Sequence, residues 1–153
     1  MESLNAGEIA ELIEDAPIAH VGVLHEGRPY VTPMSYVVID EVFYFRTAAG
    51  RRLDCIKKEA AACLEICRYD ASSGHWSSVV VTGEATVVTD PNVDARVSQA
   101  ILHKYRGLMG SPLGHPGVVP PLMQPFVVAV RPIEVTGFRS GSGLSPGLRP
   151  GRL

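Results

Sequence analysis

The chain has 153 residues, with 14 Lys and Arg against 16 Asp and Glu and a formal net charge of −2 at pH 7. This length suits one domain with its own core, and the charge balance argues against the positive field by which proteins attract nucleic acid or anionic membranes. No apolar run reaches the roughly 18 to 20 residues that cross a bilayer, and residues 1–5 lack the features of a signal peptide. We therefore expect a cytoplasmic protein without a nucleic-acid or membrane partner.

The first half of the chain is predicted to alternate short helices with strands joined by tight turns. Asn5 and Glu8 form a capping box that opens an amphipathic helix, which Pro17 ends. The elements predicted after it are strands over 18–24, 29–39 and 42–47, a helix over 51–58 and a strand over 61–68.

The second half is predicted to hold two longer strands around one helix. In the strand over 76–89, alternation places Val79 and Val81 on one face, and Gly83 on that face indicates a bulge or bend. A helix is predicted from Asp90 to about Tyr105, and a last strand over 126–138.

Two segments show no periodic pattern. Residues 107–125 are long for an internal connection, which is typical of a lid or a partner-contacting loop; His115 in this loop is either a ligand contact or an exposed loop histidine. Residues 139–153 are rich in Gly, Ser and Pro and bury little apolar surface, which predicts a flexible C-terminal tail.

The order of the elements indicates the fold class. Strand follows strand through short turns, with helices only at the margins, so an antiparallel barrel fits better than a parallel α/β sheet. The prediction is an α+β, mainly β domain over residues 1–138, followed by the tail.

An arginine pair stands where the helix over 51–58 should begin. A helix N-terminus carries partial positive charge and unpaired N–H groups, so it normally disfavours cations. Thr47, the small residues that follow it, and the guanidinium groups of Arg51 and Arg52 would together suit a phosphate. The alternative is that both arginines point into water.

The cysteines and histidines do not predict a metal site. Cys63 and Cys67 lie four residues apart on a predicted strand, about 13 Å from each other at ~3.3 Å per residue, so they can neither form a disulfide nor share a metal. The five histidines have no HxxxH or HxH spacing. Reduced, packed thiols are expected.

Three segments occur in a familiar order: 27–36 (GRPYVTPMSY), 44–54 with YFRT followed by GRRLD, and 76–85 (WSSVVVTGEA). Together they resemble the flavin-binding split-barrel family, the pyridoxamine 5'-phosphate oxidase-like proteins, near their nitroimidazole-resistance branch. The resemblance implies a six-stranded antiparallel split β-barrel that forms a homodimer and binds flavin mononucleotide (FMN) at the subunit interface.

The resemblance also implies which residues bind the cofactor. The phosphate-binding residues would be Arg51 and Arg52, with Arg46, Thr47 and Leu53 beside them. The residues implied along the flavin ring are Pro33, Met34, Ser35, Tyr36, Trp76 and Ser78. The alternative interpretation of Pro33 is a proline on an edge strand, and that of Trp76 is an exposed aromatic residue at an interface.

Two departures from the family pattern limit the function. Arg46 stands where the nitroimidazole-resistance branch would have a histidine, which argues against nitroimidazole reduction. The basic C-terminal residues with which pyridoxamine-phosphate oxidases hold substrate have no counterpart after Phe138. The function expected is an FMN-dependent oxidoreductase acting on an unidentified small molecule. The alternatives are a reductase that uses the deazaflavin coenzyme and a non-catalytic flavin- or haem-binding protein.

Overall fold

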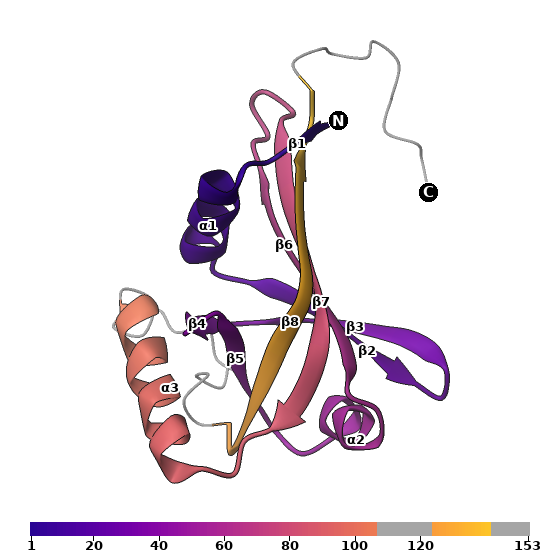
Figure 1. Ribbon diagram of the computed structural model, residues 1–153, viewed down its shortest axis with the longest axis vertical. Coiled ribbons are helices and arrows are strands. Elements are labelled where there is room, and N and C mark those ends of the chain that lie inside the picture. The colour runs from indigo at the N-terminus through magenta and orange to yellow at the C-terminus, as the bar shows by residue number, and fades with distance from the viewer. Residues whose placement is uncertain (107–123, 142–153) are drawn as a thin grey trace.

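The computed structural model describes residues 1–106 and 124–141 of the chain, and Figure 1 shows how its strands and helices are arranged. The elements in chain order are β1 (Glu2–Ser3), α1 (Ala6–Asp15), β2 (Ala19–His25), β3 (Arg28–Met34), β4 (Val37–Ile39), β5 (Val42–Thr47), α2 (Arg51–Lys58), β6 (Ala61–Tyr69), β7 (Trp76–Val87), α3 (Pro91–Lys104) and β8 (Phe126–Arg139).

The strands form one antiparallel sheet in the order β3-β2-β6-β7-β8-β5-β4, with β1 paired to β8. The two ends of this order, β3 and β4, follow each other in the chain, so the sheet closes through the backbone between them and not through a ladder of hydrogen bonds. This arrangement confirms the predicted mainly β, antiparallel split barrel with short helices at its margins.

One predicted strand is wrong in its extent. Residues 29–39 were expected to form a single strand, but the structure breaks it between β3 and β4 at Ser35 and Tyr36. The backbone N–H of Tyr36 donates to the hydroxyl of Tyr105 at 2.9 Å, and that hydroxyl also lies 2.9 Å from the carbonyl oxygen of Tyr36. The side chain of Tyr105, the C-cap residue of α3, thus takes the place of ladder partners for Tyr36. With the added β1, the sheet has eight strands instead of six.

The predicted bulge at Gly83 is confirmed. The register between β7 and β8 shifts between Thr82 and Gly83. A Cβ atom at Gly83 would collide with the carbonyl group of Arg131 on β8. The two backbones therefore approach at a position that only glycine allows.

The helices cover the apolar faces of this sheet. Leu12 of α1 and Leu53 and Ile56 of α2 join the main core formed by the inner faces of the sheet strands. Val97 and Ile101 of α3 form a second core with the sheet. Figure 1 shows α1 and α3 along one side of the long β7–β8 ribbon and α2 near its lower end.

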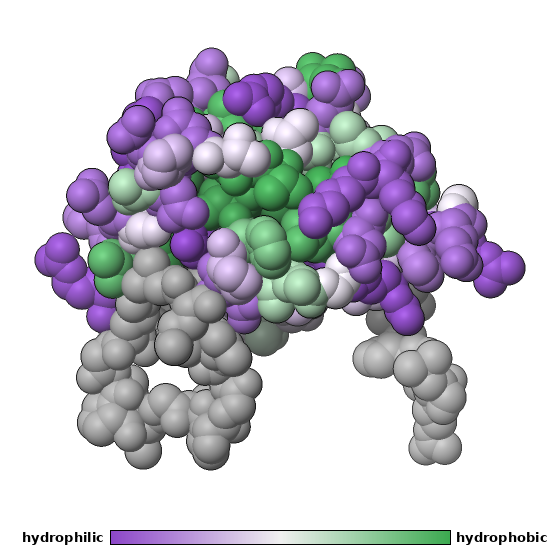
Figure 2. All heavy atoms as spheres, turned by 90° about the horizontal axis from the view of Figure 1, so that it is seen from below, coloured by the Kyte–Doolittle hydropathy of each residue, from purple (hydrophilic) through white to green (hydrophobic). Residues whose placement is uncertain are grey.

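Some apolar residues remain on the outside of the sheet. Val31 is 59% exposed and Ile133 is 75% exposed. Seen from below, an apolar area lies in the middle of the molecule and polar side chains surround it (Figure 2). No helix among the described residues is long and apolar enough to span a lipid bilayer.

Two predicted segments fall wholly or largely outside the described residues. They are most of the loop over 107–125, which includes His115, and the tail from residue 142 onward. The start of the predicted tail is described, and there β8 continues to Arg139, whose guanidinium pairs with Glu2 and Glu8.

Candidate functional site

A cleft of about 380 Å³ opens where β3 and β5 end and α2 begins. Most of the predicted site residues lie together in it. The lining residues that were predicted are Pro33, Met34, Ser35, Arg46, Thr47, Arg51 and Arg52. The others are Tyr30, Ala48, Ala49, Gly50 and Gln124. This described lining contains three arginines and no carboxylate.

Arg52 is held at the base of this cleft by two threonines. Its Nε donates to Thr32 Oγ1 at 2.7 Å, and its Nη1 donates to Thr47 Oγ1 at 2.8 Å. Partial burial lowers the pKa of Arg52, because desolvation disfavours the charged form. No described carboxylate lies within ion-pair distance of this guanidinium. The positive charge of Arg52 has no acidic partner among the described residues, so an anion in the cleft would neutralise it.

The first turn of α2 adds backbone donors to the same place. Its N-cap is Gly50, which has no side chain to accept a hydrogen bond, so the first N–H groups of α2 lack the usual side-chain acceptor. Arg51 lies over the ring of Tyr30, with 5.5 Å from Cζ to the ring centroid. This cation–π contact directs an exposed arginine along the cleft.

Arg46 differs from the other two arginines because its charge is already paired. Its Nη1 lies 2.9 Å from Asp94 Oδ1, its Nε donates to the carbonyl of Gln124 at 3.0 Å, and its side chain is only 9% exposed. Arg46 thus lines the cleft as half of an ion pair with α3. The net positive charge of the cleft comes from Arg51 and Arg52.

Four predicted site residues lie elsewhere or face away. The side chains of Tyr36 and Leu53 are buried in the core, and the Tyr36 hydroxyl donates to Ile13 O at 2.6 Å. Neither residue is among those that line the cleft. Trp76 and Ser78 do not line it: Trp76 lies beside Arg139, and the Ser78 hydroxyl donates to Glu65.

Four residues that line the cleft or contact its arginines were not predicted from the sequence. Alternation along β3 puts Tyr30 and Thr32 on one face with Met34, and that pattern could have found them. Asp94 and Gln124 reach Arg46 from distant segments, and no local signal marks them.

Comparisons with known proteins find one relative by sequence and several solved structures with the same fold. An uncharacterized protein of Mycobacterium tuberculosis is 28% identical over an alignment that covers 88% of each chain. The FAD-binding protein of Mycobacterium smegmatis superposes with a TM-score of 0.66 at 22% identity, covering 91% of this chain and 98% of that one. A candidate 5-nitroimidazole antibiotic resistance protein of Bacteroides thetaiotaomicron gives a TM-score of 0.69 at 18% identity, covering 90% and 86%.

The family itself is shown by a match along most of the chain. The profile of the family described as pyridoxamine 5'-phosphate oxidase matches residues 5–139, which include every element from α1 to β8. The chain therefore belongs to the pyridoxamine 5'-phosphate oxidase family.

Proposed function

We propose that the protein is a flavin-dependent oxidoreductase that holds FMN in the cleft at the start of α2. The observation that carries this proposal is the pair of arginines, Arg51 and Arg52, at a helix start without a side-chain cap and without a carboxylate in the described lining. These groups suit a phosphate, because guanidinium and backbone N–H groups both donate hydrogen bonds to its oxygens. The FAD-binding protein of Mycobacterium smegmatis with the same fold supports a flavin as the cofactor.

The residues of β3 would lie along the flavin ring. Pro33, Met34 and Ser35 line the same cleft as the arginines. Pro33 has no N–H to leave unpaired, and the Met34 side chain offers a polarizable apolar surface to a ring. Flavin, when bound, supplies hydride transfer, while this chain provides binding, orientation and charge.

We also propose a homodimer with the cofactor at its seam. Trp76 and Ser78 do not line the cleft of their own chain, so a second copy would have to bring them to the ring. The resemblance in sequence implies the same arrangement. Light scattering at micromolar concentration tests this part, and a monomer would contradict it.

The experiment that tests the cofactor begins with the absorbance spectrum of the purified full-length protein and mass spectrometry of any released ligand. Flavin-free protein is then titrated separately with FMN, FAD, riboflavin, the deazaflavin coenzyme and haem, and any bound flavin is assayed for reduction by NADH and NADPH. Tighter binding of FMN than of riboflavin, with turnover, supports the proposal. Tighter binding of FAD, the deazaflavin coenzyme or haem would overturn the assignment of FMN as the cofactor. Flavin binding without reduction would contradict the assignment as an oxidoreductase.

A further inference from the structure

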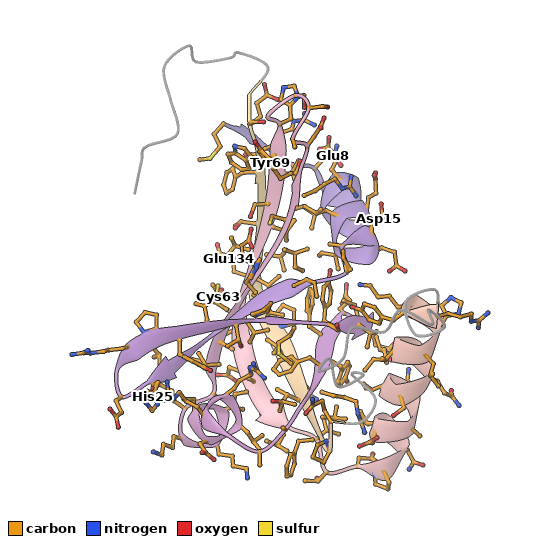
Figure 3. All side chains as sticks on the ribbon, turned by 180° about the vertical axis from the view of Figure 1, so that it is seen from behind. Glu8, Asp15, His25, Cys63, Tyr69 and Glu134 are labelled. Atoms are coloured by element: carbon orange, nitrogen blue, oxygen red, sulfur yellow. The ribbon has the colours of Figure 1, made fainter. Side chains whose placement is uncertain are left out.

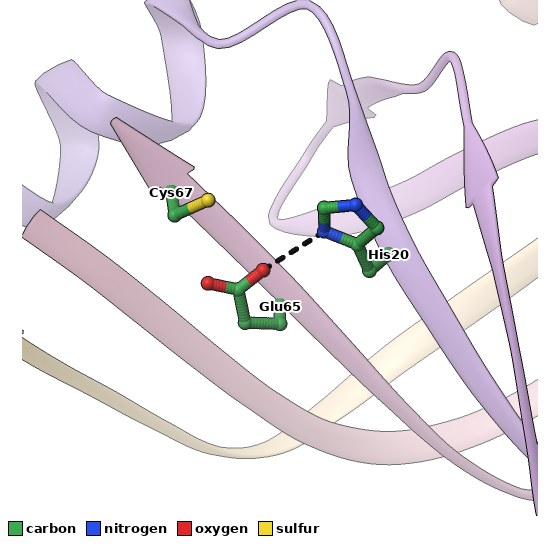
Figure 4. Close-up of side chains that lie close together, drawn as sticks. All are labelled: His20, Glu65 and Cys67. Atoms are coloured by element: carbon green, nitrogen blue, oxygen red, sulfur yellow. Dashed lines mark hydrogen bonds and ion pairs between the residues drawn. The ribbon is translucent and has the colours of Figure 1, made fainter. Parts of the chain in front are cut away.

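Three side chains with metal-binding chemistry meet on the outer face of the sheet, where His20 pairs in register with Pro33 of the cleft wall. His20 of β2 pairs in register with Glu65 of β6, and Cys67 follows two residues later on the same face of β6. One ligand atom from each residue lies within 4.8 Å of the others (Figure 4). Among the described residues this is the one group of three or more such side chains.

The carboxylate of Glu65 is fixed from both sides. Its Oε1 accepts a hydrogen bond from Ser78 Oγ at 2.7 Å, and its Oε2 lies 2.9 Å from His20 Nδ1. Metal-binding carboxylates are commonly oriented by such an outer hydrogen bond, which leaves the other oxygen directed at the ion. Ser78 therefore has the position of an orienting residue, and Oε2 faces the imidazole.

We propose that His20, Glu65 and Cys67 form a site for a divalent cation of borderline softness, with Zn²⁺ the best match. An imidazole nitrogen, a carboxylate oxygen and a thiolate sulfur are all zinc ligands, and a carboxylate with a thiolate balances the charge of the ion. Bond lengths of roughly 2.0 to 2.3 Å in a tetrahedron place ligand atoms about 3.3 to 3.7 Å apart. His20 and Glu65 would need to separate slightly, as the ion replaces the proton between them.

The surroundings of the cluster leave a fourth position for a ligand. His20 and Glu65 stand at the polar end of an otherwise mostly apolar groove of about 570 Å³, whose wall includes Gly22, Val31 and Ile133. In a single copy the side chains of His20 and Glu65 are 46% and 34% exposed, and in the homodimer proposed above, which brings Ser78 to the seam, the cluster would lie beside that seam. Three protein ligands leave the fourth position of a tetrahedral zinc ion to a water or to a group of the second copy.

The test uses the full-length protein in its flavin-free form, reduced and treated with EDTA, and titrates it with Co²⁺ and then Zn²⁺. We expect one Co²⁺ per chain, with a charge-transfer band that shows a thiolate ligand and is lost when Zn²⁺ displaces the cobalt. Cys67→Ser should abolish the band and weaken Zn²⁺ binding by at least about tenfold, and Glu65→Gln should weaken binding while retaining a thiolate band.

Two matched controls decide which thiol is involved. Cys63, which is labelled in Figure 3, lies on the same strand as Cys67. Alternation along β6 puts both thiols on one face, but Cys63 does not belong to the cluster. Cys55 is buried with its Sγ 3.6 Å from His25 Nδ1, which makes it the other thiol beside an imidazole. Cys63→Ser and Cys55→Ser should both keep the band, with unchanged circular dichroism in every variant. A band that survives Cys67→Ser, or no stoichiometric binding at micromolar Co²⁺, would overturn the proposal. Neither outcome depends on the flavin.

Discussion

The charge of Arg52 should distinguish a phosphorylated flavin from one without phosphate. A guanidinium carries five N–H donors, and Arg52 uses two of them for Thr32 and Thr47, which leaves three directed elsewhere. One or two of these would reach a phosphate. A charge-assisted hydrogen bond contributes about 1.5 to 3 kcal/mol, so Arg52→Ala should raise the Kd for FMN by roughly tenfold to a hundredfold.

The measurement is a fluorescence titration of flavin-free protein with FMN and with riboflavin. Because riboflavin has no phosphate, its Kd should change by less than about threefold. Arg28→Ala is the matched control, since Arg28 is exposed at the first position of β3 and does not line the cleft. Arg52→Ala also removes the bonds to both threonines, so its melting temperature is measured in parallel. Equal weakening of FMN and riboflavin in a folded variant would refute the assignment of the phosphate to Arg52.

Three further predictions concern stability. Gly83→Ala should lower the free energy of unfolding by about 2 kcal/mol or more in urea denaturation, whereas Gly22→Ala, where a Cβ would meet only ordinary contacts, should cost less. Arg46→Ala should lower the free energy of unfolding by about 1 to 3 kcal/mol, because it breaks an ion pair whose arginine is buried. Adding Asp94→Ala to this variant should lower it little further, because Asp94 has already lost its partner and is partly solvated. Additive losses would contradict coupling between the two residues. The pKa of Glu8 is lowered first by the backbone N–H of Asn5, the N-cap residue, and then by Arg139. The contribution of Glu8 to folding stability is therefore complete above its ordinary pKa of 4.5, and it is lost as the pH falls through the pKa of the folded state. The difference in Tm between Glu8→Gln and wild type should therefore be larger near pH 7 than near pH 3.

The sequence predicted most of the fold because its signals are local. The capping box at Asn5, the alternation along 76–87 and the glycine at position 83 each depend on neighbours in the chain, and each appears in the structure as expected. The break between β3 and β4 had no such signal. It depends on the hydroxyl of Tyr105, which lies 69 residues away from Tyr36 in sequence.

In the candidate site too, the residues with a local signal were predicted, and those that depend on contacts distant in sequence were not. Arg51, Arg52 and Thr47 were predicted from a local conflict between two cations and a helix start, and the structure brings them together. The pairing of Arg46 was not predicted, because Arg46 is on β5 and Asp94 comes from α3, 48 residues later in the sequence. Nor were the partners His20 and Glu65, since strand register and not sequence spacing makes them neighbours.

The hydroxyl of Tyr105 also affects how the chain exchanges hydrogen with solvent. It accepts from the N–H of Tyr36, and its one proton is shared between the carbonyls of Pro17 at 2.8 Å and Tyr36 at 2.9 Å. Protection of the Tyr36 amide thus depends on the C-terminal end of α3 and not on opening of the sheet. In Tyr105→Phe this amide should exchange faster while the amides of β7 keep their rates. Because Ser35 next to it lines the cleft, exchange at this single amide would report whether ligand binding and the packing of α3 are coupled.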